Sequence, residues 1–220
     1  MAIEKIKIDN KMKTIITNDW LKEFTSYKKY KPQAIEKIVG PLSLGIGYDI
    51  SYSTDVKIGF SIFNLSNPLD FMCGNVQVHP KQRYAITWQQ HEAGKYLEAA
   101  AELRELSVIP IEGPVRLSQV IEAYKTHYGV EHLTMPRYFT DPALIAGWAG
   151  KLDLAMECLE WGKFYYDKNC SRNKELDPTD IWYEKMLQKI HDPEGLRQTV
   201  EDQIVFHKLT KLPREELIID

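Results

Sequence analysis

Histidine and cysteine are the residue types in this chain that most often carry catalysis or bind metal, but their spacing matches no known site. The six histidines form no His-Glu-x-x-His pattern, and no two cysteines stand two residues apart. His79 and His91 are expected to meet only if folding brings them together beside a carboxylate. Such a site would make the chain a small hydrolase-like enzyme, which is one alternative. We assign no catalytic residue and expect no metal and no cofactor.

The three cysteines indicate a reducing compartment. Their number is odd and their spacing wide, which does not suit a disulfide framework and favours reduced thiols in a cytoplasm. Cys158 lies among apolar residues and is predicted to be a small core residue. Cys170 lies in a polar stretch and is predicted to face solvent, while the role of Cys73 is left open.

Nucleotide binding has little support in the glycine pattern. Gly45 and Gly47 follow strand-like residues, but Ile50 stands where the dinucleotide fingerprint has its third glycine. The segment continues as a strand instead of starting a helix. A phosphate-binding loop would need Gly-Lys-Ser or Gly-Lys-Thr, and neither occurs.

One short basic and aromatic run offers a nucleic-acid alternative. In the run Tyr27, Lys28, Lys29, Tyr30 and Lys31, aromatic rings could stack on bases while the lysines hold phosphates. Lysines also suit the end of a helix, where we expect this run to lie. The whole chain has a formal net charge of -3, so no strong positive field supports nucleic acid as the main partner.

An acidic helix face carries the main functional hypothesis. Glu98, Glu102 and Glu105 follow one side of a predicted helix, and rim charges of this kind speed encounter with a basic partner. Trp182 and Tyr183 are candidate aromatic contacts if they are exposed. The sequence therefore favours a non-catalytic protein-protein interaction protein that binds a basic protein. An adaptor or an antitoxin-like immunity protein of a bacterial cytoplasm would be of this kind.

Composition places the chain among compact globular proteins. It has 220 residues, of which 44% are hydrophobic and 27% charged, so it can bury a core. The first residues alternate charge without an apolar stretch, and no apolar run approaches the ~20 residues that span a bilayer. We therefore expect a cytoplasmic protein with no signal peptide and no membrane partner.

The first part of the chain is predicted to form strands. From Leu42 to Tyr52, large apolar residues alternate with small ones, and from Val56 to Ile62 the alternation resumes after a turn, which predicts a β-hairpin. Residues 74–79 predict a further strand. Asp9-Asn10 suggests a first short hairpin, and residues 17–19 suggest the cap of a helix that ends by Lys31. This helix is expected to pack on the small-residue face of the sheet.

The second part is predicted to be helical. An amphipathic pattern covers residues 93–105, and a second helix runs over 117–124 and is closed by Gly129. Three Asp-Pro pairs, at 141, 177 and 192, have the chemistry of helix starts. The helix over 152–166 is apolar around most of its circumference, with a narrow polar strip of Asp153, Glu157, Glu160 and Asp167, and is expected to lie at the centre.

Two glycine turns, at Gly94 and Gly150, resemble the turn and second helix of a tetratricopeptide repeat. A protein-binding scaffold is what that resemblance would imply. Their separation exceeds the ~34-residue period of that repeat, so we interpret both as ordinary helical hairpins.

Strands followed by helices predict an α+β fold. We expect an N-terminal antiparallel hairpin or meander with one covering helix, and then about five helices. One domain over residues 1–220 is predicted, strand-rich over 1–87 and helix-rich over 88–212.

Overall fold

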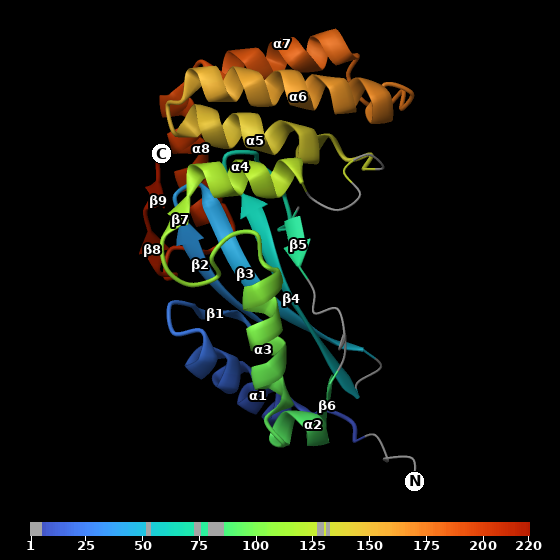
Figure 1. Cartoon of the computed structure of the whole chain (residues 1–220), viewed down its shortest axis with the longest axis vertical. Coiled ribbons are helices and arrows are strands. Elements are labelled where there is room, and N and C mark those ends of the chain that lie inside the picture. Colours follow the sequence, from blue (N-terminus) through green and yellow to red (C-terminus); the bar gives the residue numbers. More distant parts are fainter. Residues whose placement is uncertain (1–5, 52–53, 73–75, 79–85, 127–129, 131–132) are drawn as a thin grey trace.

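The fold is α+β, as predicted: an N-terminal antiparallel sheet is followed mostly by helices (Figure 1). The computed structural model describes residues 6–51, 54–72, 76–78, 86–126, 130 and 133–220. The predictions for His79, His127, Gly129, His132 and Cys73 lie outside these described residues.

The chain begins with a helix, so the predicted first hairpin is wrong. Helix α1 spans Asn10–Glu23, and the carboxylate of Asp9 accepts a hydrogen bond from the Met12 amide at 2.9 Å. Asp9 therefore caps a helix and does not turn a hairpin. The predicted cap at residues 17–19 lies in the middle of α1, and the helix ends at Glu23, before Lys31.

The sheet is an antiparallel meander of five strands with shorter strands beside it. The main strands, in spatial and sequence order, are β1 (Lys28–Lys31), β2 (Ala34–Val39), β3 (Leu42–Ser51), β4 (Asp55–Asn64) and β5 (Val76–Val78). The predicted hairpin is confirmed as β3 and β4, which pair from Leu42↔Asn64 to Ser51↔Asp55. The short strands are β6 (Ile86–Thr87) beside β4, β8 (Arg214–Glu215) beside β2, and the separate pair β7 (Val115–Arg116) and β9 (Leu217–Ile218).

Helix α1 packs on the large-residue face of the sheet, not on the small-residue face as predicted. The Tyr48 hydroxyl of β3 contacts the Thr17 side chain and donates to the Lys13 carbonyl at 3.0 Å, which ties α1 to this face. The larger residues bury the apolar area that holds a helix to a sheet, which explains the choice of face.

The small-residue face is covered partly by α8 and partly by a buried carboxyl group. Ile38 and Phe63 pack with Val200 and Ile204 of α8. Beside them Glu36 is only 7% exposed, and the Ser43 hydroxyl donates to it at 2.8 Å. Burial raises the pKa of Glu36 to about 7, although Ser43 and the charge of Lys31 act in the opposite direction.

Seven helices follow the sheet in the described part of the second half, where we expected about five. They are α2 (Trp88–Glu92), α3 (Lys95–Leu106), α4 (Leu117–Lys125), α5 (Pro136–Trp148), α6 (Leu152–Cys170), α7 (Thr179–Ile190) and α8 (Pro193–Phe206). Figure 1 shows α5, α6 and α7 stacked in successive layers beyond one end of the sheet, with α3 in front of the strands. One cluster of buried side chains runs from α1 and the sheet to α7 and joins both halves.

The three Asp-Pro pairs differ in what they do. Asp192 caps α8 as predicted, because its carboxylate accepts from the Gly195 amide at 2.9 Å. Helix α7 begins at Thr179, with Pro178 in the cap position, one residue later than predicted. The third prediction is wrong: Asp141 and Pro142 lie inside α5, which begins at Pro136.

Asp141 belongs to a buried polar network instead. Its carboxylate accepts hydrogen bonds from the Asn67 amide at 2.8 Å and the Tyr124 hydroxyl at 3.1 Å. Arg137 lies 3.7 Å from it and donates to the carbonyl groups of Asn64 and Asn67. Burial raises the pKa of Asp141, and the charge of Arg137 opposes that shift. The network fixes the turn after β4 against α4 and α5.

Helix α6 lies very close to α5. A Cβ atom on Gly162 would meet the Phe139 carbonyl oxygen of α5 at 2.2 Å, a distance that real structures essentially never show. The close approach of α6 to α5 therefore requires glycine at this position. The opposite side of α6 is open, which corrects the prediction of a helix buried on most sides. Cys170 ends this helix in a buried position, its thiol near the Thr134 carbonyl at 3.4 Å, so its predicted exposure is wrong.

Candidate functional site

The predicted acidic face of α3 lies on the surface. Glu98 and Glu105 are exposed, and Glu102 is half-buried. The Lys95 ammonium pairs with Glu98 at 2.5 Å, so part of the negative charge is already balanced within the helix. Leu97 is exposed beside these carboxylates, because Ala99, Ala100 and Leu103 form the buried side of the helix.

The two candidate aromatic residues of α7 have different positions. Trp182 is only 4% exposed and stacks on Tyr166 with ring centres 4.3 Å apart, so it is a core residue and offers no contact to a partner. Tyr183 is half-buried, its hydroxyl donates to Glu160 of α6, and the Lys163 ammonium lies 4.5 Å from its ring centre. Tyr183 therefore belongs to the outer surface formed by α6 and α7.

The basic and aromatic run is an edge strand, not a helix end. Lys28, Lys29 and Lys31 are exposed on β1. Tyr27 is buried and donates to the Ile111 carbonyl at 2.8 Å, while the half-buried Tyr30 donates to the His207 carbonyl at 3.0 Å. The exposed Lys28 and Lys29 can meet phosphates, whereas the Lys31 ammonium lies 4.7 Å from the Tyr30 ring centre. The tyrosine hydroxyls hold both rings within the fold.

The histidine and cysteine residues that the structure describes lie mainly in the core. The His91 side chain is 1% exposed, contacts Asp19 at 3.1 Å, and stacks on Tyr96 with ring centres 4.5 Å apart. Burial lowers the pKa of His91, although Asp19 opposes this shift. Burial likewise raises the pKa of the Cys158 thiol to about 11, as expected of a core cysteine. Among the described residues no group of three or more His, Cys, Asp or Glu side chains could hold a metal ion.

The outer face of α6 is a surface that the sequence analysis did not assign to a partner. The four carboxylates of the predicted polar strip, Asp153, Glu157, Glu160 and Asp167, are all exposed. Phe164 lies among them with 63% of its side chain exposed. Positions 153, 157, 160, 164 and 167 follow helical spacing, so these five side chains share one side of the helix.

A groove continues this surface between α6 and α7. It has a volume of about 650 Å³ and is lined by Glu160, Lys163, Phe164, Asp167, Lys168, Thr179 and Asp180. Two of the carboxylates are oriented by hydrogen bonds: Asp167 accepts from the Thr179 hydroxyl at 2.9 Å, and Glu160 from Tyr183. Because the hydrogen bond to Glu160 holds the phenol proton, it raises the pKa of Tyr183 to about 12.

The sequence held a partial signal for this surface. The polar strip identified the solvent side of α6 correctly, and Phe164 falls on that side by position alone. An aromatic residue inside an acidic strip is the irregularity that would have pointed to it. We call Asp153, Glu157, Glu160, Phe164 and Asp167, together with Asp180 of α7, the α6 acidic surface.

Comparison with protein-family models, curated proteins and solved structures gives no match for this chain. In the part of the chain that the structure describes, no helix combines the length and the apolar character needed to cross a membrane.

Proposed function

We propose that this chain is a non-catalytic protein-protein interaction protein that binds a basic partner through the α6 acidic surface. The observation that carries the proposal is Phe164, a large apolar side chain 63% exposed within a row of exposed carboxylates. Aromatic residues are enriched among the few that dominate binding energy at interfaces, and polar residues usually surround them.

The energetics suit a partner that covers Phe164. Burial of a Phe side chain contributes roughly 1.5–3 kcal/mol relative to full exposure, and most of that is still to be gained here. The surrounding carboxylates would contribute little affinity individually, but they attract and orient a basic partner. A partner with lysine or arginine residues around an apolar cavity fits this arrangement.

Two lysines in the groove reduce its negative charge but do not reverse it. The Lys163 ammonium lies over the Tyr183 ring, where it is drawn toward α7. Lys168 lies at the end of the groove near Asp167. Glu157 is paired with Lys125 of α4 at 2.7 Å. Five carboxylates therefore stand against three lysines, Lys125, Lys163 and Lys168, and the surface keeps a net negative charge that favours a basic partner.

An adaptor and an immunity-type inhibitor in a bacterial cytoplasm are the two roles we propose within this class. They differ in what binding does to the partner. An immunity protein abolishes its partner's activity at a one-to-one ratio, whereas an adaptor leaves that activity intact and joins the partner to a third protein. An activity measurement on the isolated partner with and without this chain separates them.

The test is affinity purification with matched variants. We expect Phe164→Ala to lose a basic partner that the wild-type chain retains at a fixed stoichiometry. Phe206→Ala is the control, because it makes the same change at a 56% exposed Phe on α8. Retention of the partner by Phe164→Ala, or equal loss by both variants, would contradict the α6 acidic surface as the binding site.

A second pair of variants compares the two acidic faces of the molecule. Glu160→Lys on α6 and Glu98→Lys on α3 change the net charge equally. We expect the first to weaken binding and the second to leave it unchanged. The opposite result would assign the partner to α3 instead.

Nucleic acid is a second candidate because three exposed lysines lie on the edge strand β1. This mode predicts an affinity for single-stranded oligonucleotides that falls steeply with salt and is lost in a variant with Lys28, Lys29 and Lys31 changed to Gln. An affinity that does not change with salt would exclude it.

A further inference from the structure

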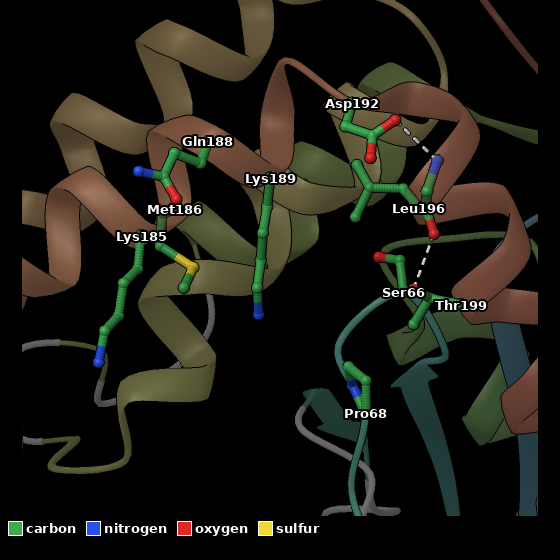
Figure 2. Close-up of a pocket in the computed structure, with 10 residues that line it drawn as sticks. Ser66, Pro68, Lys185, Met186, Gln188, Lys189, Asp192, Leu196 and Thr199 are labelled. Carbon is green, nitrogen blue, oxygen red and sulfur yellow. Dashed lines mark hydrogen bonds between the residues drawn. The ribbon is translucent and has the colours of Figure 1, made fainter.

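A cavity of about 520 Å³ lies between α7, the start of α8 and the turn after β4 (Figure 2). Its volume is within the range of small-molecule sites. It lies on the opposite side of α7 from the groove beside α6, since Lys185 and Lys189 line the cavity whereas Thr179 and Asp180 line the groove. The cavity is therefore separate from the α6 acidic surface.

The α7 wall of the cavity supplies hydrogen-bond donors and positive charge. Lys185 and Lys189 are one helical turn apart and lie on the same side, with Gln188 beside them. Lys185 donates to Asp177 at 2.7 Å, which leaves two of its three protons for other acceptors. For Lys189 the described part of the chain provides no ion-pair partner. Lys189 is exposed on this wall, and partial burial of its side chain, followed by the charge of Lys185, lowers its pKa, a shift that a nearby anion would oppose.

The opposite wall supplies acceptors. The Ser66 hydroxyl donates its proton to Asn64 at 2.7 Å, and the Thr199 hydroxyl donates to the Gly195 carbonyl at 2.8 Å. Both oxygens can therefore only accept from a ligand. Asp192 adds a negative charge, since one of its oxygens accepts from the Gly195 amide and the other is available.

Apolar side chains also line the cavity on both walls. Met186 of α7, Leu196 of α8 and Pro68 of the turn line the same cavity. Figure 2 shows Lys185 and Lys189 on the α7 side, and Asp192, Leu196 and Thr199 across the cavity from them. A ligand in the cavity meets cations on one wall, a carboxylate and hydroxyl oxygens on the other, and apolar atoms beside them.

We propose that this cavity binds a small zwitterion, with its anionic group on Lys185 and Lys189, its ammonium group on Asp192, and a short apolar part against Met186 and Leu196. Both an amino acid and an amino phosphate have this chemistry. A ligand with only one charge would leave one charged wall without a partner, which is the physical basis for the selectivity.

The experiment is a titration of the isotope-labelled full chain, in which NMR chemical shifts of the backbone amides report binding. The probes are L-leucine and phosphoethanolamine, which are zwitterions, and butyrate and butylamine, which carry one charge each. We expect a zwitterion to shift the amide signals of Gln188, Gly195 and Thr199 at concentrations at least tenfold below those needed for butyrate or butylamine. Leucine and phosphoethanolamine distinguish a carboxylate from a phosphate at the cationic end.

Two substitutions test whether both charged walls of the cavity bind the ligand. Lys189→Gln and Asp192→Asn should each weaken the zwitterion about tenfold, the size expected for one hydrogen bond between charged groups. Lys57→Gln, at an exposed lysine of β4 outside the cavity, should not change binding. The proposal is overturned if no probe shifts these amides at millimolar concentration, or if butyrate binds as tightly as leucine and Asp192→Asn has no effect. Partner capture through Phe164 tests the proposed function separately.

Discussion

The contact between α5 and α6 gives the sharpest stability prediction, because a single methyl group tests it. In an ordinary helix interior Gly→Ala stabilises by about 1 kcal/mol. At Gly162 the added Cβ would lie 2.2 Å from the Phe139 carbonyl oxygen, and that oxygen belongs to the buried backbone of α5. Backbone cannot rotate aside as a side chain can, so the two helices must separate.

The expected size follows from these two opposing effects. Overpacking a core costs about 1–3 kcal/mol and sometimes more, and this contact is at the severe end. We therefore expect Gly162→Ala to lower the free energy of unfolding by about 2 kcal/mol after the gain in helix propensity. For a chain of this length that corresponds to a fall in Tm of about 4–8 °C.

Urea unfolding followed by tryptophan fluorescence measures the difference. Gly47→Ala in β3 is the control, because a Cβ there has no atom within 4 Å. Its stability should equal that of wild type or exceed it by up to about 1 kcal/mol. A Gly162→Ala variant as stable as wild type would refute the close packing of α5 on α6.

Three further predictions concern buried polar groups. Asp141→Ala should destabilise the chain by about 3–5 kcal/mol in urea unfolding, because it leaves Arg137 buried without its counterion; a loss below 1 kcal/mol would show that the network is dispensable. Glu36 binds its proton more tightly in the folded chain, where its pKa is about 7, than in the unfolded chain, where it is near its ordinary 4.5. The free energy of unfolding should therefore fall as pH rises from about 4.5 to 7, and Glu36→Gln should match wild type at pH 4 but exceed it at pH 8 by up to about 3 kcal/mol. Equal pH dependence in both proteins would contradict the buried carboxyl. Cys158 and Cys170 should resist alkylation in native buffer and react in urea, as peptide mass spectrometry would show. Rapid alkylation of Cys170 in native buffer would contradict its burial.

Local pattern was sufficient for the hairpin and for the fold class. Large and small residues alternate strictly from Leu42 to Tyr52, and such a period is compatible only with a strand that has two unlike faces. Pattern could not decide which face receives α1, because that depends on the apolar area and the polar contacts of Tyr48. Asp9-Asn10 was misinterpreted for a related reason, since the same residue types turn hairpins and cap helices.

The environments of Asp141 and Phe164 are decided by parts of the chain that are distant in sequence. An Asp-Pro pair has the chemistry of a helix start, but the buried partners of Asp141 come from Asn67 and Tyr124, far away in the chain. Helix α6 has apolar residues around most of its circumference, so the positions of α5 and α7 decide which of them stays outside. The polar strip places Phe164 on the solvent side by position, but only the packing of α5 and α7 shows how much of its side chain stays exposed.

Hydrogen exchange of the complex tests the proposed binding surface most directly. The purified partner is added to the chain, and amide exchange is compared between peptides of α6 and α3. We expect protection over residues 157–168 and no change over 95–106, and the protection should disappear with Phe164→Ala. Protection confined to α3, or protection of α6 that Phe164→Ala leaves intact, would contradict the proposal.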